Sequence, residues 1–163
     1  MQILIFNNNI LIMKKLSFIA AIMALFICGC EKNSGNDEQQ PGTLSFSGTM
    51  SVIFRGETVP TDDVKIDVSY EEDGTLSLIF NQVKFVPQMP VSLDVKVSGI
   101  TYIDRDGVVT FSGNNIIPTY GLVNAEMPDY TVTGLTGTIS GNRLRFSLNF
   151  GAVPTSYEGA LTL

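Results

Sequence analysis

Apolar and polar residues alternate strictly from Thr43 onward, and this periodicity constrains the fold more than any other feature of the chain. Side chains two residues apart lie on the same face of a β-strand, so the pattern predicts a strand with one buried face and one solvated face. The buried positions of this first predicted strand are Leu44, Phe46, Gly48, Met50, Val52 and Phe54.

The same period-two pattern recurs along the rest of the chain. Three short connections, at 71–74, 104–107 and 140–142, contain Gly or Asn, which accept the positive φ that tight hairpin turns require. Strands joined by such turns are antiparallel neighbours. The eight predicted strands lie within residues 44–54, 64–70, 76–80, 91–97, 109–111, 130–139, 144–150 and 157–163.

A meander whose last strand is as strongly patterned as its first is expected to close on itself, because closure removes exposed sheet edges. We therefore predict an all-β fold, an eight-stranded antiparallel up-and-down barrel. A sandwich is the alternative topology, but it needs a long return connection that sequential hairpins lack. A transmembrane barrel would turn its apolar face toward lipid, and the charged, Ser- and Thr-rich opposite face without aromatic girdles argues against it.

The interior of the predicted barrel is expected to be filled. An eight-stranded barrel is either packed with its own side chains or holds one small ligand. Six aromatic side chains point inward by alternation, which favours a filled core with any cavity small and near the long-loop end. They are Phe46, Phe54, Phe80, Phe111, Phe146 and Phe150.

The two ends of the barrel are predicted to differ. One end holds the short turns, whereas the other holds longer loops at 55–63, 82–90, 114–129 and 151–156. Every proline beyond residue 42 falls in these four predicted loops. Proline stiffens a loop, and loops held by a rigid scaffold commonly carry binding sites.

Two of these loops contain many apolar residues, and apolar groups rimmed by polar ones mark an interaction surface. We predict that they contact a small apolar ligand or a protein partner; the alternative is that they plug the barrel mouth. The predicted contact residues are Phe85, Met89, Ile117, Tyr120, Leu122 and Met127.

The beginning of the chain is typical of a bacterial lipoprotein signal. A basic pair, Lys14–Lys15, precedes an apolar stretch too short to span a membrane, and Gly29 precedes Cys30. We predict a signal peptide over 1–29 with its true start at Met13, lipid attachment at Cys30, a polar tether over 30–42 and a barrel domain over 43–163. Such a protein would be lipid-anchored to the outer membrane of the cell envelope, facing the periplasm or the cell surface.

Composition excludes several classes of function. The chain has no histidine, which removes the commonest general base and zinc ligand. Removal of residues 1–29 leaves eight basic and sixteen acidic side chains, a net charge of −8 that argues against nucleic acid. The Asp-x-Asp-Gly motif at 104–107 lacks the closing carboxylate of a calcium loop and is predicted to be a turn. We predict no cofactor, no metal and no catalytic residue.

Several segments resemble the calycin-like β-barrel domain family of Bacteroidetes lipoproteins. They include the signal, the polar tether, the start of the domain at 42–48, the hairpin 73–78 and the stretch 135–139 before Leu144. The resemblance covers about residues 43–163 and implies a lipocalin-like eight-stranded barrel on the envelope of a Gram-negative bacterium. The family has no established functional residues to transfer. Segment 114–130 fits its pattern least well.

Three functional hypotheses follow. The first is an envelope-anchored, non-enzymatic binding module for a small apolar molecule or a protein partner. The second is a structural or accessory subunit of an outer-membrane assembly with a dry, filled barrel. The third is an enzyme, which would have to work through carboxylates and tyrosines without histidine.

Overall fold

Strands dominate the computed structural model, which describes residues 42–85 and 89–162. The predicted signal peptide, Cys30 and most of the tether lie outside the described residues. Most of the described residues belong to ten strands and one short helix. These are β1 (Thr43–Phe54), β2 (Glu57–Tyr70), β3 (Leu76–Val83), β4 (Leu93–Arg105), β5 (Val108–Gly113), β6 (Thr119–Tyr120), β7 (Ala125–Glu126), the 3-10 helix η1 (Pro128–Tyr130), β8 (Val132–Ser140), β9 (Arg143–Phe150) and β10 (Val153–Leu161). No helix of the described segments is long and apolar enough to cross a bilayer.

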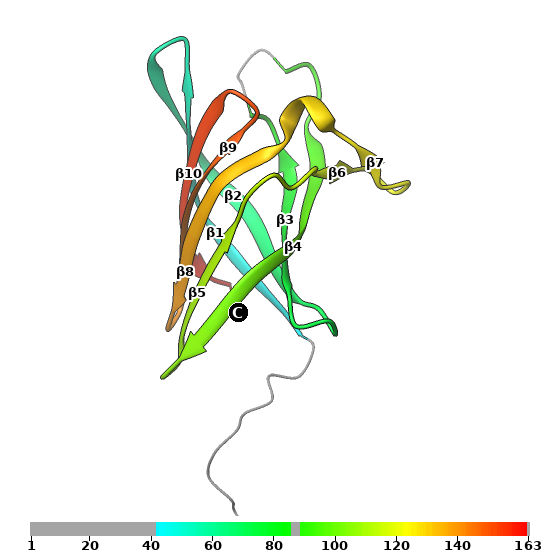
Figure 1. Ribbon diagram of the computed structural model, residues 1–163. Helices are drawn as coiled ribbons and strands as arrows, with labels where there is room; N and C mark the ends of the chain where they lie inside the picture. Colours follow the sequence, from blue (N-terminus) through cyan, green and yellow to red (C-terminus); the bar gives the residue numbers. More distant parts are fainter. Residues whose placement is uncertain (1–41, 86–88, 163) are drawn as a thin grey trace, which may run out of the picture. The chain divides into compact units, whose positions relative to one another are not determined.

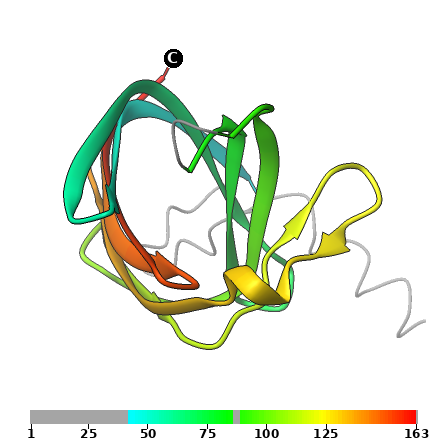
Figure 2. The same cartoon turned by 90° about the horizontal axis from the view of Figure 1, so that it is seen from above.

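Eight of the strands form a closed antiparallel barrel (Figures 1 and 2). Each pairs with the next along the chain in the order β1, β2, β3, β4, β5, β8, β9 and β10, and β10 returns to β1 from Phe46↔Leu161 to Val52↔Thr155. The predicted up-and-down barrel is confirmed. The remaining pair, β6 and β7, forms a hairpin that pairs with β4 through Val95↔Tyr120.

The core lies inside the barrel and is filled by aromatic and aliphatic side chains. The rings of Phe80 and Phe150 meet edge to face with centroids 5.2 Å apart, and Phe85 packs on Phe150 at 4.4 Å. Phe46, Phe80, Phe111, Phe146 and Phe150 are buried as predicted. Phe54 is the exception: it is only half-buried, because it lies on the part of the β1–β2 hairpin that extends beyond the other strands.

Two glycines make room for large rings in this core. A Cβ at Gly137 would lie 2.3 Å from Cζ of Phe111, and a Cβ at Gly159 would lie 2.2 Å from the Tyr157 hydroxyl oxygen. The space above Gly159 lets Tyr157 stack on Phe146 and donate a hydrogen bond to the Val64 carbonyl at 3.1 Å. Burial raises the pKa of Tyr157, because the phenolate is poorly solvated there.

Two predicted loops are instead strands joined by tight turns. The β1–β2 connection is only Arg55–Gly56, with φ of 53° and 83°, and the β9–β10 connection is only Gly151–Ala152. Arg-Gly can adopt the two positive φ values of a two-residue hairpin turn, so β2 begins at Glu57 rather than near residue 64. The predicted loops at 55–63 and 151–156 were therefore wrong.

Pro60 and Pro154 consequently lie in strands, at positions where a strand edge is free. β2 pairs with β3 only from Lys65 onward, and β10 pairs with β1 only from Thr155 onward. Pairs in an antiparallel hairpin alternate between hydrogen-bonded and non-bonded, counting from the turn. By this alternation, the backbone nitrogens of Pro60 and Pro154 face the free edges. Each proline therefore removes a backbone N–H donor from an edge to which a further strand could otherwise pair.

A candidate binding cleft between β2 and β3

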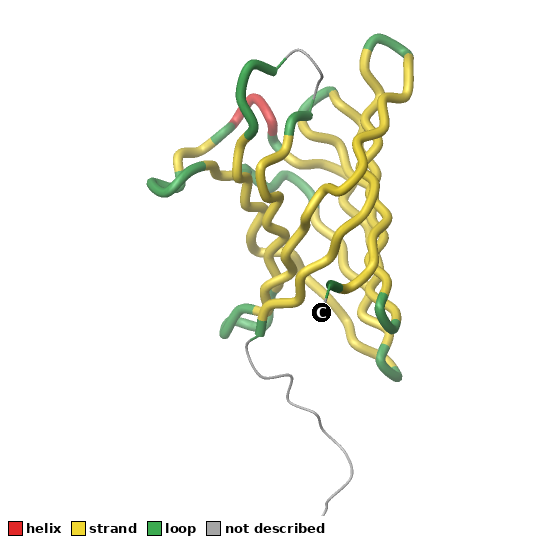
Figure 3. The backbone as a smooth tube through the Cα atoms, turned by 180° about the vertical axis from the view of Figure 1, so that it is seen from behind, coloured by secondary structure: helices red, strands yellow, loops and turns green. Residues whose placement is uncertain are grey.

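Two β-bulges lie where β2 and β3 stop pairing with each other, toward the end of the barrel from which the β1–β2 hairpin extends (Figure 3). In β2, Asp62 and Asp63 together oppose the single residue Thr49 of β1. In β3, Asn81 and Gln82 together oppose Asp94 of β4. A bulge bends its strand and raises the local twist. Because the last β2–β3 pair, Lys65↔Asn81, lies beside both bulges, the two strands part at this height.

Side chains hold both bulges in place. Asp63 has a φ of 58° and Gln82 a φ of 52°, a left-handed conformation that costs free energy for residues with a Cβ. Thr49 donates a hydrogen bond to the Asp62 carboxylate at 2.7 Å. Asp94 Oδ1 accepts from both the backbone and the side-chain nitrogen of Gln82, each at 2.8 Å. These bonds offset the backbone strain.

The parted strands border a cleft of about 760 Å³, which we call the β2–β3 cleft. Cross-strand partners share a face of the sheet, so Val59 of β2 faces inward with its buried partner Val52. The rim of the cleft includes Pro60 and the polar residues Asp62, Asp63, Lys65, Asn81, Gln82, Lys84 and Ser92. Its floor is apolar and consists of Val52, Val59, Val64, Val83 and Phe85.

The charges of the rim balance. Asp62 and Asp63 lie on the β2 side with Lys65, and Lys84 lies beyond β3. Neither lysine forms an ion pair with a residue of the described segments. A cleft of this kind, with an apolar floor and a few polar groups around it, matches the usual make-up of small-molecule sites.

The structure separates the sequence-predicted contact residues into two groups. Phe85 is buried in the cleft floor, and its amide donates to Sδ of the half-buried Met89 at 3.3 Å. Ile117, Tyr120 and Leu122 lie on or beside the β6–β7 hairpin. Of the same group, Met127 directly follows β7 and packs against the core. The cleft and the hairpin are therefore two distinct features.

Sequence reasoning missed most of the cleft. Val59, Val64 and Val83 were treated as loop or ordinary core residues, because their part in the floor depends on the bulges. The acidic pair Asp62–Asp63 was the available signal, since Asp tolerates a left-handed backbone better than most residues.

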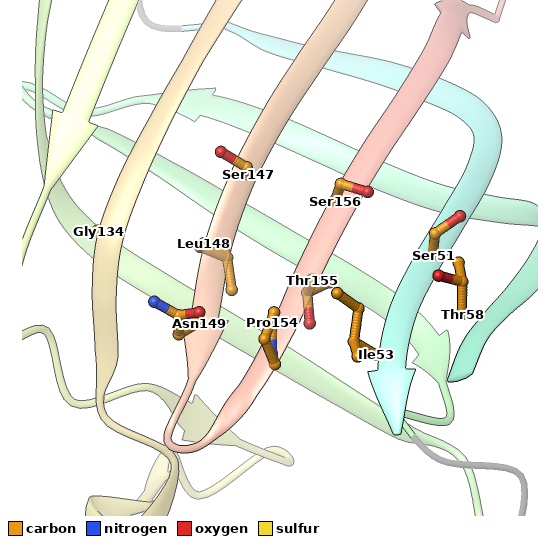
Figure 4. A pocket seen from close by; sticks show the side chains of 10 residues that line it. All are labelled: Ser51, Ile53, Thr58, Gly134, Ser147, Leu148, Asn149, Pro154, Thr155 and Ser156. Atoms are coloured by element: carbon orange, nitrogen blue, oxygen red, sulfur yellow. The ribbon is translucent and has the colours of Figure 1, made fainter. Parts of the chain in front are cut away.

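A second, shallower groove of about 300 Å³ lies on the outer face of the barrel over β1, β9 and β10 (Figure 4). Its hydroxyl side chains lie on neighbouring strands, with Ser51 opposite Ser156 and Ser156 opposite Ser147. Ile53 and Pro154 add apolar surface beside them. This groove has no buried apolar floor comparable to that of the β2–β3 cleft, so it is the weaker candidate for an apolar ligand.

Comparison with known proteins agrees with the observed architecture. No match was found among curated proteins or among solved structures. The model of one family, described as the calycin-like beta-barrel domain, matches residues 44–162. This match spans all eight barrel strands and the β6–β7 hairpin, and barrels of this kind are in general binding modules. The chain belongs to the calycin-like β-barrel domain family.

Proposed function

We propose that this protein is a non-enzymatic binding module of the bacterial cell envelope that takes a small apolar molecule into the β2–β3 cleft. The observation that carries the proposal is the β2–β3 cleft itself, whose floor combines the half-buried Val59 with the buried side chains of Val52, Val64, Val83 and Phe85. Burying an apolar ligand against such a floor removes about 25 cal/mol of unfavourable hydration for each Å² covered.

The free edge of β2 favours a small molecule over an added peptide strand. Strand addition relies on backbone hydrogen bonds along an exposed edge. Pro60 lies in the middle of the unpaired part of β2 and offers no N–H there. A peptide could therefore not form a continuous ladder along this edge, whereas a compact apolar ligand needs only the floor.

The envelope location and the lack of catalysis are supported by the sequence. The signal ending at Cys30 and the polar tether favour a lipid-anchored protein, as in the Bacteroidetes lipoproteins that the chain resembles. A single acyl chain gives marginal membrane binding, so stable attachment needs a multiply acylated cysteine or a second contact. The absence of histidine disfavours the common hydrolytic mechanisms.

Native mass spectrometry of the protein isolated from its own host tests the ligand. We expect a reproducible adduct of a few hundred daltons that disappears on denaturation. Val59→Trp should fill the cleft and abolish the adduct, because Val59 is only half-buried and faces the open space. Ile53→Trp is the matched control: it lies on the same hairpin, is 46% exposed and points to the outer face.

The same experiment separates the alternatives. An adduct that is lost in Ile53→Trp but kept in Val59→Trp would place the ligand in the outer groove and contradict the proposal. A bare mass for the native protein would favour the second candidate, an accessory subunit of an outer-membrane assembly, which is consistent with the filled barrel interior. Crosslinking in intact cells should then yield one dominant partner.

A further inference from the structure

The tip of the β6–β7 hairpin exposes two adjacent aliphatic side chains to water. Leu122 is 104% exposed and Val123 is 85% exposed, and both lie at the apex of the turn between Tyr120 and Ala125. Figures 1 and 2 show that the hairpin projects sideways from the barrel wall. Single exposed aliphatic residues are common on proteins, but a projecting pair at one tip is the pattern of an interaction site.

The hairpin is held firmly at its base. Tyr120 pairs with Val95 of β4, and the Gly121 amide donates to the Asp94 carbonyl at 3.2 Å. The apex itself is closed by a hydrogen bond from the Asn124 amide to the Gly121 carbonyl at 3.2 Å. Both of these turn residues have positive φ, which suits Gly and Asn. The tip is thus a preformed protrusion, and little conformational entropy would be lost when it binds.

The segment 117–125, which includes the tip, is uncharged and carries an aromatic residue, Tyr120. Residues 117–125 contain no acidic or basic side chain. Ile117 is 44% exposed and Tyr120 is 40% exposed, so apolar surface continues from the apex toward the base. Tyrosine places an apolar ring beside a polar hydroxyl, a combination that suits the boundary between lipid and water.

We propose that Leu122 and Val123 insert into the headgroup boundary of a phospholipid bilayer, so that the hairpin docks the barrel on a membrane surface. The size of the exposed apolar surface favours this occupant over a protein. A stable protein interface takes roughly 20–30 residues on each side, whereas the tip offers four apolar side chains. A few aliphatic groups are enough to strengthen attachment to a membrane to which the lipid proposed at Cys30 would already hold the protein. This docking is independent of the cleft and of its ligand.

The bilayer that the hairpin tip would enter is expected to be one of zwitterionic phospholipids. The chain carries a net charge of −6, and no basic residue lies within 117–125 to attract anionic headgroups. Insertion should therefore depend on the aliphatic side chains and respond little to salt. An electrostatically driven contact would behave in the opposite way.

Tryptophan fluorescence provides a direct test, because the chain has no native Trp. The isolated domain 42–163 is suitable, since its core is closed entirely within the barrel. We expect Leu122→Trp to shift its emission to shorter wavelength on addition of phosphatidylcholine vesicles and to be quenched by brominated lipid. Ile103→Trp is the matched control: it is a 57% exposed position near the β4–β5 turn and should not respond.

A second variant measures the size of the effect. Leu122→Asp should lower the partition of the domain onto phosphatidylcholine vesicles about tenfold or more, as expected from the loss of one buried aliphatic side chain. It should leave the thermal unfolding temperature unchanged, because Leu122 contacts solvent only. Equal responses of Leu122→Trp and Ile103→Trp, or no response of either, would overturn the proposal. Binding that requires anionic lipid and disappears in salt, or an emission shift that requires a protein and no lipid, would also overturn it.

Discussion

Tyr157→Phe tests how the cleft floor is tied to the barrel. The Tyr157 hydroxyl of β10 donates to the carbonyl of Val64, the floor residue beside the β2 bulge, at 3.1 Å. Phe keeps the ring that stacks on Phe146 and removes only this bond. A buried hydrogen bond of this type contributes about 1 kcal/mol net, so we expect the free energy of unfolding to fall by about that amount at pH 8.

The size of this loss should depend on pH. Burial raises the pKa of Tyr157 in the folded protein, while an unfolded tyrosine titrates near pH 10. Below about pH 10 both states hold the proton and the full stabilisation is present. Above it, only the unfolded state releases the proton, so the folded state loses about 1.4 kcal/mol for each pH unit until the folded pKa is reached. The Phe variant lacks this loss, so the two proteins should become equally stable close to pH 11.

Urea unfolding followed by circular dichroism at pH 8, 10 and 11 measures the difference. Tyr130→Phe serves as the control, because Tyr130 is 43% exposed. It should match the native protein at every pH. A difference between the native protein and Tyr157→Phe that stays constant from pH 8 to pH 11 would refute the argument from burial. No difference at pH 8 would show that the hydrogen bond to Val64 contributes nothing.

Two further changes test the packing and the electrostatics of the barrel. Gly137→Ala should cost roughly 1–3 kcal/mol, because its Cβ would overlap the Phe111 ring, and the cost should shrink in a Phe111→Leu background; thermal unfolding of the double-mutant cycle measures it. Ser77→Ala should raise the pKa of Glu71 toward its usual range, because the Ser77 hydroxyl bonded to this carboxylate at 2.7 Å is the main cause of its lowered pKa. A carboxyl NMR titration checks this, and an unchanged midpoint would assign the shift to Lys96 instead.

The strands and their closure could be predicted because each barrel strand buries one face. Period-two alternation survives wherever the two faces differ in polarity, and it recurs in the predicted strands between Leu44 and Leu161. The turns were harder to place. Arg55–Gly56 closes a two-residue hairpin although it lacks the usual Asn-Gly signal, so the strand after it was mistaken for a loop around Pro60.

The candidate sites depend on β-bulges and on a short hairpin, and the alternation of apolar and polar residues reveals neither. A bulge adds one residue to one strand, and its effect on the neighbouring strand is a property of the folded sheet. The β6–β7 hairpin was missed because each of its strands has only two residues, too few to show a period. Leu122 at its tip was nevertheless among the predicted contact residues, because the predicted loop 114–129 contains many apolar residues.

The closing pair of strands has a consequence for how the barrel folds. Every other pair of neighbours in the barrel is joined by a connection within the chain, which brings the two strands together and limits their register. The β1–β10 seam has no such connection: Thr162 bonds to Ser45, 117 residues away. Its entropy of closure is the largest in the molecule, so pairing of β1 with β10 is the step that closes the eight successively connected strands into a ring.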